Sequence, residues 1–128
     1  MTEPTWLTTD IVKAIHSQQI AQHGGADGVR EEGLLESALA RPRQKHAYGE
    51  PDIPEMAAAY AFGIARNHPF IDGNKRTALM AAYVFLRLNG LVLDASEVEA
   101  VVTFRDLAAG ELDESQLARW LKANVKSA

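Results

Sequence analysis

Residues 74–89 restrict the fold more than any other part of the chain, because they carry apolar side chains on nearly every face of a helix. The longest uninterrupted apolar run spans nine residues, from Ala78 to Leu86, between Arg76 and Arg87. A helix that is apolar all round must be surrounded by other elements. Nine residues are too few for a bilayer span, which needs about 20. We therefore expect a central, buried helix in a protein that does not associate with membranes.

The rest of the chain predicts further helices around this one, in an all-α, single-domain bundle over residues 1–128. Proline disfavours helical backbone at the residue before it, so Pro42 is expected to end the second helix and residues 41–51 to form a loop or flap. Leu91–Leu93 is expected to be a short extended piece. A first helix is expected from Thr8 or Thr9 to Gly24, and further helices are expected over residues 31–40, 54–66 and 96–110. The last helix is expected to begin at Asp113 and to extend far enough to place Val125 on its apolar side.

Composition and charge exclude several functions. The chain has no cysteine, which rules out disulfides and cysteine nucleophiles. Its net charge of −4 disfavours direct contact with nucleic acid, and the N-terminal residues show no secretory pattern, so we expect a cytoplasmic protein. Between Met56 and Leu93, however, four basic residues accompany a single acid, Asp72, giving a local charge of +3. On charge alone, an anion site and a chance cluster explain this equally well.

The segment 67–78 combines residue types that suit a phosphate site. It reads Asn-His-Pro-Phe-Ile-Asp-Gly-Asn-Lys-Arg-Thr-Ala. A helix that begins just after Gly73 presents unpaired first-turn amides, and these amides together with the helix dipole attract an anion. Lys75 and Arg76 in that first turn oppose the dipole, a conflict that a bound anion would remove. The candidate donors are the amides from Gly73 to Arg76.

Two side chains of the same segment suggest chemistry. A lone carboxylate beside phosphates commonly holds Mg²⁺, which makes Asp72 the candidate metal ligand. His68 has a side chain that accepts a proton near neutral pH and could act on a hydroxyl. Each residue could also have a purely structural role, His68 as a loop residue and Asp72 as a turn or helix-cap residue. Phe70 and Ile71 are expected to anchor the loop in the core.

The segment resembles the Fic/Doc family, and within it the death-on-curing (Doc) toxin branch. The family pattern His-x-Phe-x-Asp/Glu-Gly-Asn-Gly/Lys-Arg is matched by residues 68–76. The resemblance implies a Fic-type helix bundle in which His68 is the general base, Asp72 helps to hold Mg²⁺, and ATP phosphates bind the amides with Asn74, Lys75 and Arg76. It also implies a flap that aligns the target, here assigned to residues 41–51. The flap contacts would be Tyr48 and Gly49, while Arg66 would either reach phosphate or pair with a carboxylate.

Departures from the commoner family pattern bear on the reaction. Most members are adenylyltransferases with glycine after the motif asparagine and a second arginine three residues beyond the first; here those positions hold Lys75 and Leu79. In the Doc branch this change goes with phosphoryl transfer from ATP to a threonine of elongation factor Tu, which arrests translation. Adenylyl transfer and a catalytically silent antitoxin-binding module stay as alternatives.

The resemblance also implies a separate antitoxin protein as partner. Family members often restrain themselves with a Ser/Thr-x-x-x-Glu-Gly/Asn helix. The only glutamate followed by glycine or asparagine is Glu32, and Gly28 stands where the serine or threonine would be. Inhibition would therefore come from a partner, with Trp6 and Trp120 as candidate anchors, although core packing is their commoner role.

Overall fold

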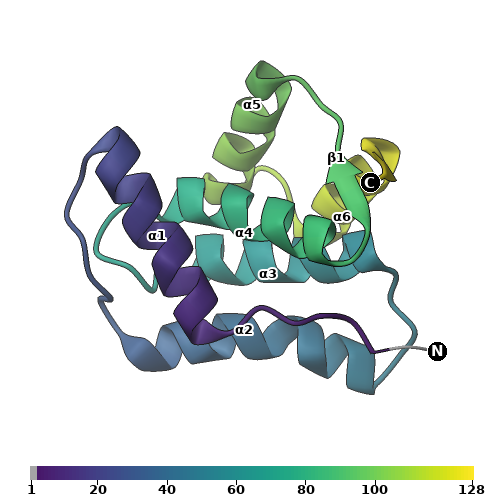
Figure 1. Cartoon of the computed structure of the whole chain (residues 1–128), viewed down its shortest axis with the longest axis horizontal. Helices are drawn as coiled ribbons and strands as arrows, with labels where there is room; N and C mark the ends of the chain where they lie inside the picture. Colours follow the sequence, from purple (N-terminus) through teal and green to yellow (C-terminus); the bar gives the residue numbers. More distant parts are fainter. Residues whose placement is uncertain (1–2) are drawn as a thin grey trace.

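Within residues 3–128, which the structure describes, the computed structural model contains helices at every expected region and one small sheet (Figure 1). The all-α prediction is confirmed. The elements are α1 (Thr9–His23), α2 (Glu32–Ala47), α3 (Ile53–Asn67), α4 (Asn74–Leu88), β1 (Leu91–Leu93), α5 (Glu97–Ala108), α6 (Glu114–Ala123) and β2 (Val125–Ser127).

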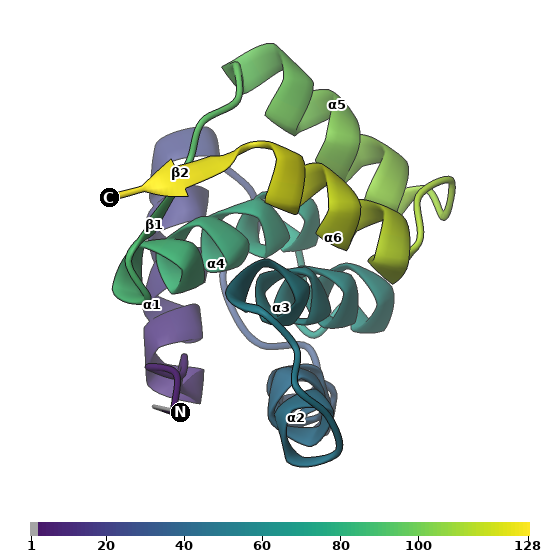
Figure 2. The ribbon, with the colours of Figure 1, turned by 90° about the vertical axis from the view of Figure 1, so that its right-hand side faces the viewer.

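The helices form layers around α3 and α4, which run antiparallel through the middle (Figures 1 and 2). α2 packs on one side of α3, α5 and α6 lie on the other side, and α1 crosses α4. The predicted central position of α4 is confirmed, since Ala78, Ala81, Ala82, Phe85 and Leu86 are fully buried. Because α3 ends and α4 begins at the same end of the molecule, the segment 68–73 that joins them lies at that end, with His68, Ile71 and Asp72 exposed.

The helix starts agree with the caps expected from the sequence. Thr8, Ser96 and Asp113 each accept a hydrogen bond from a first-turn amide through the side chain. Asp52 and Glu55 form a reciprocal capping box at the start of α3. Such caps satisfy amides that have no partner inside the helix, which is why local sequence located these boundaries well.

The prediction that Pro42 ends the second helix is wrong. α2 continues to Ala47 with Pro42 buried in its interior, so most of the expected flap is helical. Partners from a distant helix stabilise this extension, since Arg41 and Lys45 place their cationic nitrogens 2.6 and 3.0 Å from the carboxylate of Glu114. Tertiary contacts of this kind override a local helix-breaking preference.

The C-terminal helix also ends earlier than expected. α6 stops at Ala123, and Val125 lies in β2, where it is paired antiparallel with Leu93 of β1. The extended piece at Leu91–Leu93 is thus confirmed, but its partner strand was missed. A three-residue strand has little periodicity of its own and forms only because a distant strand supplies hydrogen bonds.

α2 and α3 pack closely at Gly63. A Cβ atom placed on Gly63 would lie 3.0 Å from the Cα and 3.1 Å from the carbonyl oxygen of Ala38. Both contacts are to backbone of a packed helix, so the neighbour has little freedom to move away. The small residues of α3 therefore set how closely the two helices pack.

We expect Gly63→Leu to lower the free energy of unfolding by about 1–3 kcal/mol through overpacking. Gly33→Leu is the matched control, because a Cβ at Gly33 meets nothing within 4 Å. Replacing a helical glycine there should leave stability unchanged or raise it by up to about 1 kcal/mol. Urea unfolding measures both. Equal effects at the two positions would contradict close packing at Gly63.

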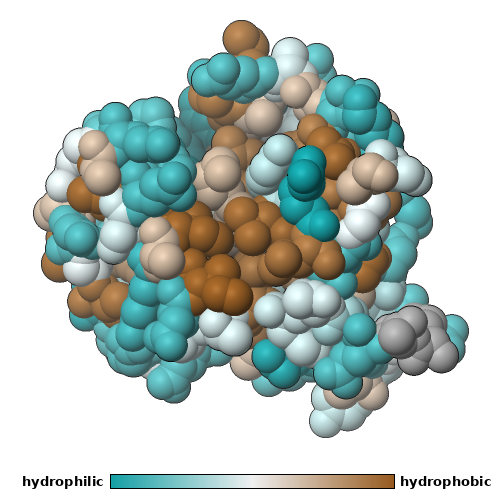
Figure 3. All heavy atoms as spheres, in the orientation of Figure 1, coloured by the Kyte–Doolittle hydropathy of each residue, from teal (hydrophilic) through white to brown (hydrophobic). Residues whose placement is uncertain are grey.

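One face of the molecule carries apolar surface over α4, between α1 and α5 (Figure 3). The exposed apolar residues of these helices are Ile11, Leu88, Val98, Val101 and Val102. Over residues 3–128, no helix has both the length and the apolar character to cross a bilayer.

Candidate functional site

The histidine of the motif sits where α3 ends, in a backbone conformation that is uncommon for its residue type. His68 has φ 48° and ψ 56° and is the left-handed C-terminal cap of α3. Arg30 stabilises this turn by donating from Nε to the carbonyl of His68 (2.8 Å) and from Nη2 to the carbonyl of Asn67 (3.0 Å). Strained backbone of this kind persists only where surrounding contacts hold it. The His68 side chain itself is exposed.

The start of α4 presents unpaired amides, as predicted. Gly73 caps the helix in a left-handed conformation (φ 75°), and its carbonyl accepts from Thr77. In the part of the chain that the structure describes, the amides of Asn74, Lys75 and Arg76 have no acceptor. The amide of Gly73, which was also a candidate donor, instead donates to Oδ1 of Asp72 (2.8 Å).

Asn74 has a different role from the one predicted for its side chain. It is buried, its Oδ1 accepts from the amide of Phe70 (3.0 Å), and its Nδ2 donates to the carbonyl of Phe70 (2.9 Å). These two bonds close the turn that leads into α4, so only the backbone amide of Asn74 faces an anion.

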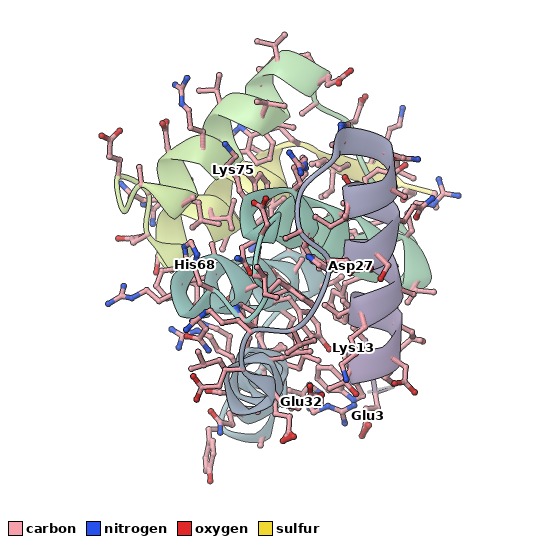
Figure 4. The ribbon with its side chains drawn as sticks, turned by 90° about the vertical axis from the view of Figure 1, so that its left-hand side faces the viewer. Glu3, Lys13, Asp27, Glu32, His68 and Lys75 are labelled. Atoms are coloured by element: carbon pink, nitrogen blue, oxygen red, sulfur yellow. The ribbon has the colours of Figure 1, made fainter. Side chains whose placement is uncertain are left out.

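One hollow of about 380 Å³ brings most of the predicted site residues together. It is lined by His68, Ile71, Asp72, Gly73, Asn74, Lys75 and Arg76. Figure 4 looks at this end of the bundle and shows His68 and Lys75 there, with Asp27 nearby on the α1–α2 connection. The expected core position of Phe70 is confirmed, but that of Ile71 is wrong, because Ile71 is 56% exposed at the rim.

Arg76 is the residue whose geometry most clearly suits an anion. Its Nη2 donates to the carbonyl of Gly24 (3.1 Å), which holds the guanidinium beside the hollow. Its Nε is buried and has no hydrogen-bond partner among the described residues. A buried cationic donor without a partner is costly unless a ligand supplies the acceptor. The residues present therefore fit a phosphate group.

Three predicted residues do not join the hollow. Tyr48 and Gly49 follow the C-terminal end of α2, whereas the motif lies at its N-terminal end, about 24 Å away along a helix of 16 residues. Arg66 instead lines a second hollow, which shares His68 with the first. Its guanidinium lies 5.5 Å from the ring centre of Phe62, and among residues 3–128 it pairs with no carboxylate.

The segment that does lie beside the motif is the α1–α2 connection, which the sequence analysis missed. Val29 forms an isolated antiparallel bridge with Phe70, the amide of Arg30 donates to the carbonyl of Pro69 (2.7 Å), and the amide of Ile71 donates to the carbonyl of Gly28 (3.1 Å). The glycines at 24, 25 and 28 were the available signal, since glycine permits close backbone approach.

A metal ion at this site would have few protein ligands. Asp72 is the carboxylate in the hollow, and no group of three or more His, Cys, Asp or Glu side chains suited to a metal occurs among the described residues. Mg²⁺ prefers oxygen ligands and commonly takes one or two carboxylates together with phosphate oxygens and water. The donor set fits that pattern of binding.

Comparison with known proteins identifies the family. The profile described as the Fic/DOC family matches residues 6–86, which include the whole motif loop. The chain belongs to the Fic/DOC family. It is 38% identical over 117 residues to the "Protein kinase doc" of Escherichia phage P1, covering 90% of this chain and 91% of that protein. It is 49% identical over 75 residues to the "Toxin Doc" of Mycolicibacterium smegmatis, covering 56% of this chain and 57% of that protein.

The similarity to the phage protein is not confined to the motif loop. The match to the phage protein spans nearly the full length of both chains, so similarity extends beyond the motif to the surrounding helices. The resemblance implied a motif loop between two central helices, and segment 68–73 lies between α3 and α4.

Proposed function

We propose that this chain is an ATP-dependent protein kinase and a toxin of a toxin–antitoxin system. It transfers the γ-phosphoryl group of ATP to a threonine or serine hydroxyl of a translation factor. The observation that carries the proposal is the convergence of His68, Asp72 and the free first-turn amides of α4 on one hollow. The relative from phage P1, which bears the name of a protein kinase, supports the choice of reaction.

The phosphates bind at the positive end of α4. The amides of Asn74, Lys75 and Arg76 donate to phosphate oxygens, and Nε of Arg76 gains the acceptor that it otherwise lacks. The charges of Lys75 and Arg76 offset the phosphate charge at the same place. In phosphoryl transfer, positioning and charge stabilisation supply most of the catalysis.

His68 acts as general base at the edge of the hollow. Its imidazole takes the proton of the target hydroxyl while that oxygen bonds to the γ-phosphorus. The bond between the γ-phosphorus and the bridging oxygen of the β-phosphate breaks, and ADP leaves with that electron pair. Asp72 would hold Mg²⁺, which neutralises charge on the phosphate oxygens.

Lys75 and Leu79 favour phosphoryl over adenylyl transfer. Lys75 occupies the second position of the first turn of α4 and lines the hollow. A side chain there prevents the close backbone approach that glycine permits, and its charge suits a terminal phosphate. Leu79 is partly buried against the core and offers no second cation for the phosphates.

ATP labelled at different phosphates tests the reaction. Purified protein, Mg²⁺ and a bacterial lysate are incubated with ATP labelled in the γ- or the α-phosphate. We expect label in a target protein only from the γ-phosphate, followed by identification of the target by mass spectrometry. Label from the α-phosphate would establish adenylyl transfer instead, and no label from either would support a catalytically silent binding module.

We expect Lys75→Gly to lower phosphoryl transfer about tenfold and to permit measurable adenylyl transfer, because it removes a charge and opens space for the nucleotide. Lys75→Ala is the matched control. It removes the same charge but keeps a Cβ atom, so it should lower phosphoryl transfer without producing adenylyl transfer. The same two labelled forms of ATP measure both products. Unchanged products in Lys75→Gly would contradict this account of the nucleotide pose.

We propose elongation factor Tu as the target, on the Doc-type resemblance of the motif. The α1–α2 connection, rather than Tyr48 and Gly49, lies where a flap could align the target backbone, because residues 28–30 already pair with the motif loop. Its outward edge is the place for an extended target segment.

We propose that a cognate antitoxin inhibits this protein. Of the suggested anchors, Trp6 stacks on Phe85 (6.3 Å between ring centres), and Trp120 packs edge-on against Phe104 (6.4 Å). Both tryptophans therefore contribute to packing. The exposed apolar surface between α1 and α5 is better suited to a partner helix.

A further inference from the structure

A buried histidine of α1 lies directly beneath the motif loop, and it is the strongest unexplained feature of the site. His16 is 1% exposed. Its ring stacks on Phe70, with 3.9 Å between ring centres and an interplanar angle of 6°. A buried polar ring of this kind requires hydrogen-bond partners, and both of its nitrogens face oxygen atoms.

The partner of Nε2 is the backbone of the predicted metal ligand. Nε2 of His16 lies 2.7 Å from the carbonyl oxygen of Asp72. A carbonyl oxygen only accepts, so Nε2 carries the proton and donates it. On the other side of the ring, Oδ1 of Asp27 lies 3.4 Å from Nδ1, and the same oxygen accepts from the amide of Gly28 (2.8 Å).

The bond to Asp72 fixes one particular peptide plane. The peptide that accepts from His16 at its carbonyl also contains the amide of Gly73, which donates to Oδ1 of Asp72. Fixing this plane therefore orients the carboxylate of Asp72 and the left-handed turn of Gly73. The turn at Gly73 leads directly into α4 and so sets the direction of its first amides, which belong to residues that line the hollow.

We propose that His16 is a positioning residue for the Fic/DOC site of this chain. By holding the 72–73 peptide, it aligns the Asp72 carboxylate and the anion-binding amides of α4, although it touches no substrate. This inference rests on the proposed function. Residues that orient a metal-binding side chain without touching the metal typically change metal affinity or activity 10- to 100-fold when they are replaced.

Two substitutions separate the hydrogen bond from the packing of the ring. His16→Phe keeps an aromatic ring over Phe70 but lacks a donor, and His16→Gln keeps a donor but lacks the ring. We expect His16→Phe to weaken Mg-ATP binding and to lower kcat/KM by about 10- to 100-fold. His16→Gln should keep most of the affinity and kcat/KM of the unsubstituted protein. Val12→Ala, a change at a fully buried residue one turn earlier on α1, should lower stability while the folded protein keeps its kinetics.

Measurements besides activity decide the outcome. Calorimetry gives the affinity for Mg-ATP, and amide ¹H–¹⁵N spectra report residues 73–76 directly. We expect His16→Phe, but not Val12→Ala, to shift those amide signals. If His16→Phe does not fold, the ring ¹⁵N spectrum of the unsubstituted protein still tests the hydrogen bond through a protonated Nε2 that exchanges slowly with solvent.

Three results would overturn the positioning role: normal kinetics in His16→Phe, failure of His16→Gln to rescue, or a deprotonated Nε2. Failure of the proposed kinase function can be told apart from failure of the role of His16. If the kinase proposal is wrong, the unsubstituted protein itself binds no Mg-ATP and transfers no phosphoryl group. The amide shifts and the ring spectrum still report whether His16 holds the loop.

Discussion

His68→Ala is expected to abolish toxicity and to lower phosphoryl transfer by about 10²- to 10⁴-fold, because it removes the proposed general base. The side chain is exposed, so the fold should survive the change. Growth arrest after expression in bacteria and transfer from γ-labelled ATP measure the two effects. Binding of the antitoxin should persist, since the surface proposed for it is formed by exposed apolar residues of α1, α4 and α5.

His68→Asn is the companion variant, because the backbone at His68 is left-handed. Asparagine tolerates that conformation better than alanine but supplies no base. We expect His68→Asn to be as inactive as His68→Ala and at least as stable. Growth arrest that persists in both variants would instead support a binding module without catalysis.

Gly25→Ala is expected to lower kcat/KM about 100-fold by displacing the carboxylate of Asp72. A Cβ atom at Gly25 would lie 2.6 Å from Oδ2 of that carboxylate, closer than real Cβ atoms approach, and 3.2 Å from its Cγ, so the carboxylate has to move. Misplacing a catalytic group by about 1 Å costs on the order of 10²-fold in rate. The dependence of the rate on Mg²⁺ concentration should shift to higher Mg²⁺ as well.

Gly90→Ala is the control for this substitution. Gly90 and Gly25 both have positive φ values, 86° and 117°, so alanine strains the backbone at both, by about 1–3 kcal/mol. Gly90 follows the C-terminal end of α4, away from the hollow, and a Cβ there meets nothing within 4 Å. Thermal unfolding should show similar destabilisation in the two variants, while only Gly25→Ala loses activity. Equal loss of activity in both would attribute the effect to lost stability and not to Asp72.

Local sequence located the parts of the fold that local chemistry controls. The caps at Thr8, Ser96 and Asp113 and the apolar run of α4 identified helices that the structure confirms. The prediction from local sequence was wrong at Pro42, where α2 stays helical and pairs with Glu114 through Arg41 and Lys45. It also missed β2, which forms by pairing with β1. Both errors occur where a distant partner decides the local conformation.

The candidate site divides in the same way. Spacing in the segment 68–76 was enough to predict a turn, a helix start and unpaired amides, because all three depend on neighbouring residues. The sequence also identified Arg76 as a cation in that first turn, but its buried, unpaired Nε depends on the surrounding fold.

What the sequence by itself determined is the order of helices and the chemistry carried by one loop, since both arise from residues close together in the chain. Only the tertiary structure decided what supports that loop. His16 lies 56 residues from Asp72 and Arg30 lies 38 from His68, yet both hold the loop by hydrogen bonds to its backbone. Bonds to backbone carbonyls depend on where the chain passes and not on which side chain it carries there, and no local pattern records them.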